Sequence, residues 1–432
     1  MQQEELHRLI RPDRIHGSVY VDPTIFDREM RQIFGRTWIF LGHESQAAKT
    51  GDYYATRIGY EPVLMLRGKD GALRGFYNRC AHKGAQLVPD GQGSARAIRC
   101  GYHGWIYALD GALRTIPLQK GYCEDHVRPG ACEYGMAPLP GFESYRGFVF
   151  ARLADNGPTL REWLGPLASS IDNFVDRAPE GDIEVAGGVL RYEHDCNWKF
   201  FLENTLDALH PMVVHMSAAR PARAVAAELP AGANDMHFEL QALAPFTGSY
   251  DFFDAMGARV LPNGHGDLGG QASIHSDYSV DEAYRDAMIA AYGGDRTSEI
   301  LGISRNNSVA YPSLMLKAPV QLLRVVRPIA VDRTVIETWH FRLKGAPPSI
   351  LQRTVAYSTL VNSSAGMVGP DDHEMYRRMQ AGLRAGRPEW IEIGRHPELP
   401  EPDAEGARIV EGTSDAMFRA QFAEWKRLME AA

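Results

Sequence analysis

The sequence predicts an α+β protein of two domains, and three observations support this prediction. The chain has 432 residues, more than one ordinary hydrophobic core takes up. Residues 38–153 show short apolar runs separated by turn residues, as expected for an all-β domain. From residue 157 onward the apolar spacing becomes helical and is then mixed with strand-like runs. We therefore expect an N-terminal arm at 1–37 that packs on the second domain, an all-β domain at 38–155 and a mixed domain at 156–432.

Composition and charge are those of an ordinary soluble globular protein. Apolar residues make up 44% of the chain, charged residues make up 23%, and the net charge is −8. Since no run of lysine and arginine stands out, we expect no nucleic-acid partner. The start, MQQEELHRLIRPDRIHG, is charged and has no apolar core, and no uncharged apolar stretch reaches about 18 residues. We expect no signal peptide, no membrane span and a cytoplasmic location.

Two Cys/His pairs are the first chemical signal along the chain. Cys80 and His82 stand two positions apart in YNRCAHKGAQL, and Cys100 and His103 stand three positions apart in IRCGYHGWIY. Lys-Asp-Gly and Asp-Gly turns nearby predict hairpins, so we expect each pair to lie at a hairpin tip.

These pairs allow three interpretations. A structural zinc site takes thiolate and imidazole ligands, but its hairpins usually bring one ligand type per arm. A Rieske [2Fe–2S] cluster needs two thiolates on one iron and two imidazoles on the other, so each hairpin supplies one ligand of each type. The third interpretation is that the histidines are incidental surface residues. One cysteine and one histidine per arm favour the cluster, and Trp105 stands next to the second pair, where it can shield the site.

A second group of polar residues lies in an apolar, helix-like stretch of the mixed domain. The segment NWKFFLENTLDALHPMVVH, residues 197–215, contains Asp207, His210 and His215. Buried histidines need polar partners, and a metal ion supplies them. Two histidines and one carboxylate, with open positions opposite, form the facial triad of non-heme Fe(II) enzymes that activate O2. The alternative is a helix with two satisfied core histidines.

Pro211 predicts how the two histidines meet. They are five residues apart, which splays them by about 140° on a regular helix. Proline lacks a backbone N–H and disfavours helical geometry at the residue before it. We therefore expect a helix from 198 to break near 210, so that His215 turns back toward His210.

The later part of the mixed domain predicts two strands and two helices. QLLRVVRPIAV and VIETWHFRL are strand-like, and helices are expected near 372–384 and 414–430. The first of these helices opens with Asp371 and Asp372, either of which suits a metal or a helix cap. No G-x-G-x-x-G follows a strand, so this chain is not expected to take hydride from NAD(P)H itself. We expect a separate reductase to do so and to supply the electrons.

The chain resembles the α subunits of Rieske non-heme iron ring-hydroxylating oxygenases. Segments such as GHESQAAKTGDYYATRIG and FESYRGFVFARL are similar to the benzoate-type subgroup. The resemblance covers most of 17–216 and returns around 305–345 and 362–384. It implies an all-β Rieske domain and a catalytic domain of antiparallel sheet with helices, of the helix-grip or START-like type. It also implies that the cluster ligands are Cys80, His82, Cys100 and His103, that the iron ligands are His210, His215 and Asp372, and that Asp371 is left for capping.

The resemblance further implies a terminal oxygenase of aromatic hydrocarbon catabolism. Such a protein uses one [2Fe–2S] cluster, one mononuclear Fe(II), O2 and electrons from a separate reductase, with or without a ferredoxin. It mono- or cis-dihydroxylates an aromatic substrate, for which an aromatic carboxylate is a candidate. The alternatives are O- or N-demethylation of a small aromatic or quaternary-amine compound and, from a different class, an electron-transfer metalloprotein. A head-to-tail homotrimer is implied, and the presence of a small β subunit stays open.

Substrate-binding residues are not fixed by the sequence. Residues 217–300 are expected to wall the pocket, and Arg220, Arg223 and Arg305 are candidates for a carboxylate clamp. Asp207 is expected to act without binding iron. The resemblance implies that it reaches a cluster histidine of the neighbouring subunit, His103, and the alternative is that it only orients His210.

Overall fold

The computed structural model forms two compact units, which consist of residues 34–160 and of residues 1–33 together with 161–432. It describes residues 6–122, 127–229, 237–270, 272–276, 278–279 and 281–431. No helix in these ranges has the length and apolar character needed to cross a membrane.

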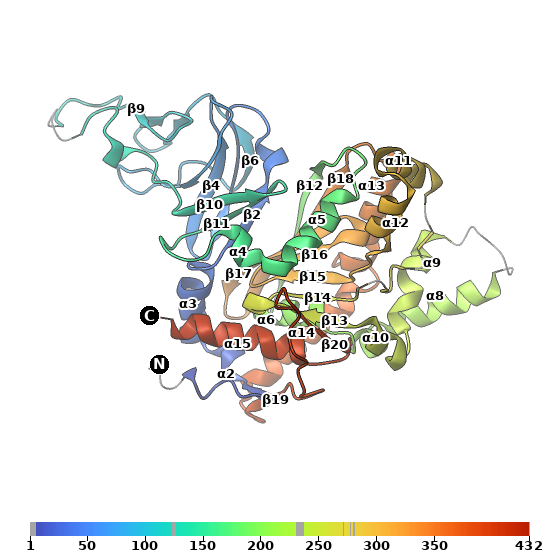
Figure 1. Cartoon of the computed structure of the whole chain (residues 1–432). Helices are drawn as coiled ribbons and strands as arrows, with labels where there is room; N and C mark the ends of the chain where they lie inside the picture. Colours follow the sequence, from blue (N-terminus) through green and yellow to red (C-terminus); the bar gives the residue numbers. More distant parts are fainter. Residues whose placement is uncertain are drawn as a thin grey trace. The chain divides into compact units, whose positions relative to one another are not determined.

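Unit 34–160 consists of three antiparallel sheets (Figure 1). The first has the order β10-β11-β2 and contains β2 (Ile39–His43), β10 (Gly141–Tyr145) and β11 (Phe148–Arg152). The second has the order β5-β4-β3-β6 and contains β3 (Asp52–Ile58), β4 (Glu61–Arg67), β5 (Leu73–Tyr77) and β6 (Gly91–Ser94). The third has the order β7-β8-β9 and contains β7 (Ile98–Arg99), β8 (Ile106–Tyr107) and β9 (Leu113–Thr115). The 3-10 helices η2 (Glu44–Ala47) and η3 (Cys132–Tyr134) complete the unit, which confirms the predicted all-β character.

Only one of the two Cys/His pairs lies at a hairpin tip. Cys100 and His103 stand in the turn between β7 and β8, as expected. Cys80 and His82 instead follow β5 in a loop toward β6, and these two strands lie at opposite edges of their sheet. The expected hairpin does form, between β4 and β5, but the pair lies at its open end because the turn is at the other end of those strands.

The larger unit is built on one eight-stranded antiparallel sheet. Its order is β12-β18-β17-β16-β15-β14-β13-β20. The strands are β12 (Ile183–His194), β13 (Ala258–Val260), β14 (Gly266–Leu268), β15 (Asn307–Ala310), β16 (Leu314–Lys317), β17 (Leu322–Ala330), β18 (Arg333–Leu343) and β20 (Arg408–Val410). A small second sheet pairs β1 (Arg14–His16) with β19 (Trp390–Glu392). The two strand-like runs of the sequence correspond to β17 and β18.

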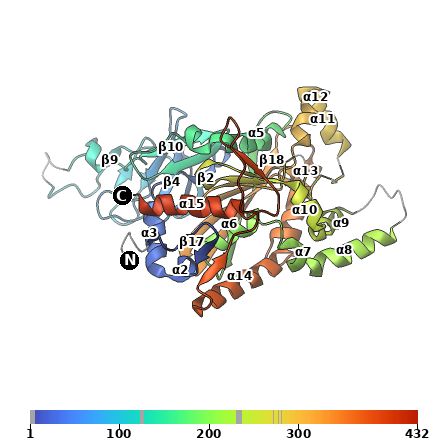
Figure 2. The same ribbon diagram turned by 60° about the horizontal axis from the view of Figure 1, so that its bottom comes forward.

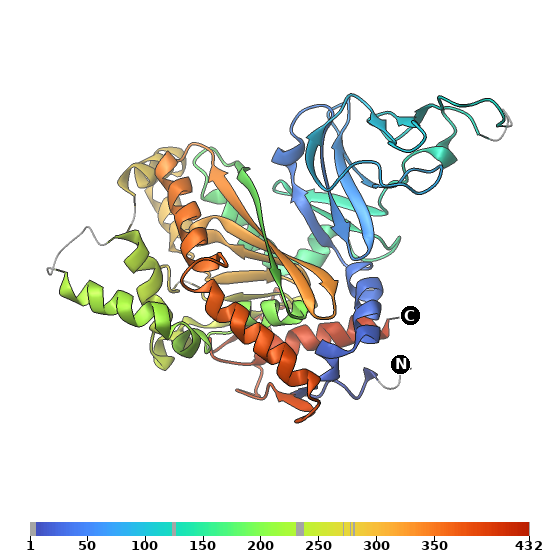
Figure 3. The same cartoon turned by 180° about the vertical axis from the view of Figure 1, so that it is seen from behind.

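Helices cover both faces of the large sheet. Figure 1 shows α5 on one face, and Figure 3 shows α13 and α14 across the other. Figure 2 shows the N-terminal α2 beside α14, in agreement with their direct contact. The α-helices are α2 (Ser18–Val21), α3 (Pro23–Glu29), α4 (Leu160–Leu164), α5 (Ala168–Asp176), α6 (Trp198–Leu206), α7 (Pro211–Val214), α8 (Met216–Glu228), α9 (Phe238–Leu243), α10 (Tyr250–Met256), α11 (Glu282–Tyr292), α12 (Gly294–Gly302), α13 (Pro348–Tyr357), α14 (Gly369–Arg384) and α15 (Ala416–Glu430). The remaining helical turns are η1 (Met30–Phe34), η4 (Gly165–Leu167), η5 (Ala244–Thr247), η6 (Pro262–Gly264), η7 (Ala318–Val320) and η8 (Ser358–Asn362).

The helix that begins at residue 198 ends before the histidines, three residues earlier than expected. α6 ends at Leu206, because Asp207 is extended with φ −93° and ψ 123°. His210 has helical φ and ψ angles although it precedes Pro211. Pro211 begins α7 at its first helical position, where the missing N–H costs nothing, so the proline starts a helix and does not end one.

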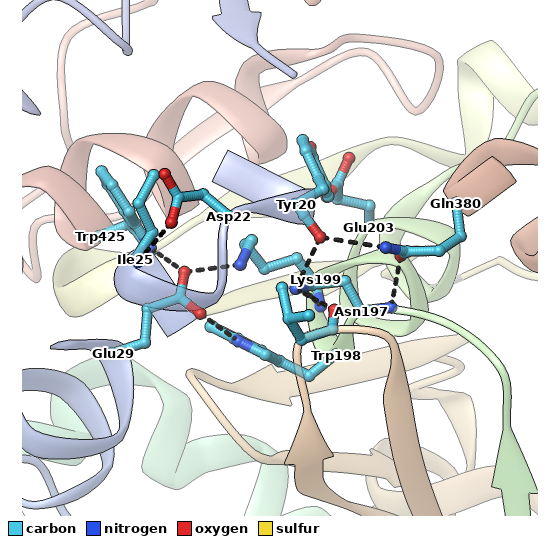
Figure 4. A network of polar contacts seen from close by, with 11 residues as sticks. Tyr20, Asp22, Ile25, Glu29, Asn197, Trp198, Lys199, Glu203, Gln380 and Trp425 are labelled. Atoms are coloured by element: carbon cyan, nitrogen blue, oxygen red, sulfur yellow. Dashed lines mark hydrogen bonds and ion pairs between the residues drawn. The ribbon is translucent and has the colours of Figure 1, made fainter. Parts of the chain in front are cut away.

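A buried polar network joins the N-terminal arm to α6 (Figure 4). The fully buried carboxylate of Glu29 on α3 accepts the Lys199 Nζ proton at 2.6 Å and the indole protons of Trp198 at 2.8 Å and Trp425 at 2.7 Å. Burial lowers the pKa of Lys199, and Glu29 acts against that shift. This network fixes α6, and with it the segment that leads to the histidines.

Replacing Lys199 by methionine is expected to destabilise the larger unit by about 3–5 kcal/mol, because Glu29 then keeps a buried charge without its ion-pair partner. Thermal or denaturant unfolding that follows this unit measures the loss. The double variant Glu29→Gln/Lys199→Met removes both charges and should recover part of the stability. A single variant as stable as the unaltered protein contradicts this account of the network.

Candidate metal centres

Two matching loops hold the Cys/His pairs. In each, the cysteine N–H donates to the carbonyl five residues later: Cys80 to Ala85 and Cys100 to Trp105, both at 2.8 Å. In each, a glycine N–H four residues on donates back to the cysteine carbonyl, from Gly84 at 3.0 Å and from Gly104 at 3.1 Å. These glycines have φ angles of +72° and +74°, which only glycine adopts without strain. The loops therefore close locally and present the side chains between cysteine and glycine.

The four side chains are sorted by type. The Cys80 and Cys100 side chains are each buried and lie close enough to interact, while the imidazole rings of His82 and His103 are 4.5 Å apart between centroids. The Nδ1 atoms of both histidines are buried and find no hydrogen-bond partner among the described residues. Two thiols on one side and two unsatisfied imidazole nitrogens on the other fit a [2Fe–2S] cluster with ligands sorted by iron.

Aromatic side chains surround this site. His82 stacks on Trp105 at 4.9 Å, and its Nε2 lies 2.9 Å from the Tyr122 hydroxyl. The Tyr107 hydroxyl lies 3.1 Å from Cys80 Sγ. The two histidines are partly exposed, so the imidazole side of the site is the side that solvent reaches.

A second candidate site lies in the larger unit. In the described part of the chain, one group of three possible ligands lies within 4.8 Å of one another, and it consists of His210, His215 and Asp372. Asp372 Oδ1 is 3.7 Å from His210 Nε2 and 3.5 Å from His215 Nε2. Two imidazoles and one carboxylate fit a non-heme iron. Because the Cys/His side chains form no such group, they do not converge on a single ion, as a zinc site requires.

Two further acids face the outer nitrogens of the histidines. Asp207 Oδ2 lies 3.3 Å from His210 Nδ1, and Asp371 Oδ2 lies 3.5 Å from His215 Nδ1. Carboxylates in this position fix the ring and its tautomer. Asp207 and His210 meet across a break in the helix, where Asp207 also accepts the Leu209 N–H at 2.7 Å.

The expected capping role of Asp371 is wrong. α14 begins at Gly369, two residues before Asp371, and no side chain caps its first turn. Asp371 instead accepts the Ser217 hydroxyl proton at 2.8 Å, which ties α14 to α8. Asn204 on α6 donates to Asp372 Oδ1 at 3.1 Å and orients that carboxylate.

The surroundings shift the pKa values of the two histidines in opposite directions. Burial lowers the pKa of His215 below its usual value. Burial acts the same way on His210, but Asp207 and Asp372 outweigh it and raise the pKa of His210. Neutral imidazole is the form that binds metal, so burial favours the metal-binding form of His215, whereas Asp207 and Asp372 favour the protonated form of His210.

The cavity beside this group is not lined by the arginines that the sequence suggested. Arg223 Nε donates a hydrogen bond to the Ala244 carbonyl. Arg305 donates one to the Ser170 hydroxyl oxygen and lies 4.0 Å from Asp267. Arg220 is exposed. Residues 217–300 contribute part of the wall, and the large sheet, α13 and α14 contribute more, including Lys317 and Arg324, which sequence reasoning missed.

Comparisons with known proteins cover both units. Residues 37–134 match the Rieske [2Fe-2S] domain, and residues 184–408 match the catalytic domain of the ring hydroxylating alpha subunit. The chain is 32% identical over 428 residues to toluate 1,2-dioxygenase subunit alpha of Pseudomonas putida, which covers 96% of this chain and 91% of that protein. It is 30% identical over 386 residues to the 2-halobenzoate 1,2-dioxygenase large subunit of Burkholderia cepacia, which covers 88% of this chain and 80% of that protein. A solved naphthalene 1,2-dioxygenase mutant bound to phenanthrene has the same fold, with a TM-score of 0.80, 20% identity and coverage of 100% of this chain and 96% of that chain.

Proposed function

The chain belongs to the α subunits of Rieske non-heme iron ring-hydroxylating oxygenases, and on this premise we propose that it hydroxylates an aromatic carboxylate. Such α subunits are terminal oxygenase components, which carry a Rieske cluster and a mononuclear iron and receive electrons from a separate reductase or ferredoxin. Two of its relatives act on toluate and 2-halobenzoate, both aromatic acids. This observation favours a carboxylate substrate over a hydrocarbon.

We assign each cofactor to the residues that the geometry favours. Residues 34–160 form the electron-carrying domain, where Cys80, Cys100, His82 and His103 hold the cluster. The larger unit is the catalytic domain, where His210, His215 and Asp372 would hold the iron. The bound iron supplies O2 activation and the cluster supplies single electrons. Asp207 and Asp371 lie 3.3 Å and 3.5 Å from the Nδ1 atoms of His210 and His215 and are the proposed orienting groups for the two rings.

Replacing His103 by cysteine is expected to keep a cluster but to lower its reduction potential by hundreds of millivolts from the Rieske range of about −150 to +300 mV, because an imidazole ligand is exchanged for thiolate. Redox titration and the visible absorption spectrum of the purified variant test this. Tyr102→Phe, next to the ligand in sequence, is the matched control and should leave both unchanged. If potential and spectrum stay the same in His103→Cys, then His103 is not a ligand.

Product analysis tests the function. A panel of aromatic acids is incubated with the holoenzyme, a reductase, NADH and isotopically labelled O2. The molecular masses of the products are then measured. Two labelled oxygen atoms in a product indicate cis-dihydroxylation and one indicates monohydroxylation. Release of formaldehyde assigns demethylation, the second candidate reaction. Loaded protein that oxygenates none of these acids contradicts the proposal.

We also propose that the α subunit works as a homotrimer in which the cluster of one subunit serves the iron of the next. The exposed edges of His82 and His103 support this, because they let a neighbouring carboxylate approach the cluster. Asp207, whose side chain is 27% exposed, is the proposed contact residue on the catalytic side. Light scattering of the purified protein measures the assembly, and a monomer that turns over at full rate rules this arrangement out.

A further inference from the structure

Two cations lie side by side on one face of the large sheet. β16 and β17 pair so that Met315 stands opposite Arg324 and Lys317 stands opposite Leu322. Residues two apart on a strand share a face, so Lys317 and Arg324 are diagonal neighbours on the same face. Both side chains line the cavity that also contains His210, His215 and Asp372.

Among the described residues, no carboxylate lies within ion-pair distance of either cation. The Lys317 ammonium lies 3.3 Å from Asn306 Oδ1 and 3.3 Å from the Tyr357 hydroxyl, both neutral, and within the described ranges no carboxylate pairs with it. The Arg324 guanidinium lies over the Phe201 ring at 4.4 Å, and its buried Nε has no hydrogen-bond partner in the same ranges. Lys199 is equally buried, yet it has Glu29 as its partner.

Burying a cation without a neighbouring anion costs free energy, and such cations persist where they bind a ligand. Burial lowers the pKa of Lys317 to about 7, with Arg324 acting in the same direction. Arginine stays charged at this pH. An anion bound between Lys317 and Arg324 stabilises the charged form of the lysine. It also accepts hydrogen bonds from donors that have no partner in the protein.

The rest of the cavity suits an aromatic ring. Its walls include the apolar side chains of Phe246, Phe253, Leu268 and Ile274. Phe246 lies 5.3 Å from His215 between ring centroids, so the apolar wall reaches the ligand group. The positive charges of Lys317 and Arg324 offset the negative charges of the two acids that line the cavity, Asp207 and Asp372. A divalent iron therefore leaves the cavity with net positive charge, which favours an anionic substrate.

We propose that Lys317 and Arg324 form an anion subsite that binds the carboxylate of an aromatic acid while its ring lies among the apolar side chains near the iron ligands. This inference rests on the proposed function and deepens it by naming the residues that select the substrate class. Tyr357 and Asn306 hold the lysine in place through the contacts described above.

Calorimetric titration of the holoenzyme with benzoate and with benzamide, its neutral isostere, tests the subsite. The unaltered protein should bind benzoate at least about tenfold more tightly, since a charge-assisted hydrogen bond in a buried site is worth that factor or more. Lys317→Met should lose that preference, with benzamide binding unchanged. Lys344→Met removes the same charge from the surface, where Lys344 pairs with Asp182, and should bind benzoate normally.

Unfolding of the ligand-free protein gives a readout that does not depend on activity. Because Lys317→Met removes an unpaired buried cation, its melting temperature should stay equal or rise, whereas a lysine with a purely structural role would lower it on removal. Lys317→Arg keeps the charge and should keep the benzoate preference. If Lys317→Met does not fold, Arg324→Gln takes its place and should weaken benzoate binding about tenfold.

Each failure has a distinct meaning. Equal affinity of the unaltered protein for benzoate and benzamide overturns the subsite, as does unchanged benzoate binding in the lysine variant. If neutral arenes are bound and hydroxylated while aromatic acids are not, the chain is still an oxygenase, but the proposed carboxylate substrate and the subsite are both wrong. If the loaded enzyme oxygenates neither class, the proposed function itself fails, whatever the affinities are.

Discussion

Replacing Asp372 by alanine is expected to remove the mononuclear iron and abolish product formation, while the [2Fe–2S] cluster stays bound. Asp372 is the carboxylate that approaches both His210 Nε2 and His215 Nε2, so its loss leaves two imidazoles, too few ligands to retain Fe(II). Iron content should fall from about three to about two atoms per chain, since the cluster accounts for two. Metal analysis together with the cluster's visible spectrum measures both sites in one sample.

Asp371→Ala is the matched control, because it removes the neighbouring acid from the same helical turn. Asp371 contacts Ser217 and faces the outer nitrogen of His215, away from the shared ligand atoms. This variant should retain iron, with metal affinity or activity reduced by about 10–100-fold, the usual effect of losing such a supporting contact. Iron loss in Asp371→Ala together with iron retention in Asp372→Ala reverses the assignment.

Replacing Asp207 by alanine is expected to leave both metal centres in place but to slow reoxidation of the reduced cluster by substrate and O2 by at least about 100-fold. Asp207 lies 3.3 Å from His210 Nδ1 and is partly exposed, so in the proposed homotrimer it can connect the iron site with a cluster histidine of the next subunit. Stopped-flow absorption of the reduced cluster measures the rate, and metal analysis verifies both centres.

Glu203→Gln is the matched control for Asp207, since Glu203 is the acid one turn earlier on α6. Burial raises the pKa of Glu203 to about 8, so it is largely protonated at neutral pH and glutamine imitates that state. The control should reoxidise normally. Normal reoxidation in Asp207→Ala excludes the bridging role, and loss of the mononuclear iron in that variant shows that Asp207 only positions His210.

Strands and helices with clear periodicity were predictable from the sequence. The apolar runs that became β17 and β18 and the helix α15 lie where the pattern placed them, because a long buried face repeats with a fixed period. The break before His210 was predictable in kind but misplaced, since a proline both ends and begins helices. Its effect depends on where the preceding turn stops, here at the extended Asp207.

The sequence by itself determined the donor types and their local grouping. Cys80 with His82 and Cys100 with His103 are held in loops that close within five residues, so spacing alone shows that each pair acts together. His210 and His215 also meet locally, but through the short helix α7 that begins at Pro211 and not through their spacing alone. Short-range contacts of this kind depend on backbone hydrogen bonds between near neighbours, which sequence patterns record.

Only the tertiary structure decided which distant residues meet these groups. Asp371 and Asp372 are adjacent and chemically identical, and the packing of α14 against α6 and α8 is what turns one toward both Nε2 atoms and the other toward Ser217. Lys317 and Arg324 become neighbours through strand register, and Lys199 meets Glu29 across 170 positions of sequence. Such pairs form because the sheet and its helices bury a shared core, and the energy of that burial depends on the whole fold and not on any local stretch of chain.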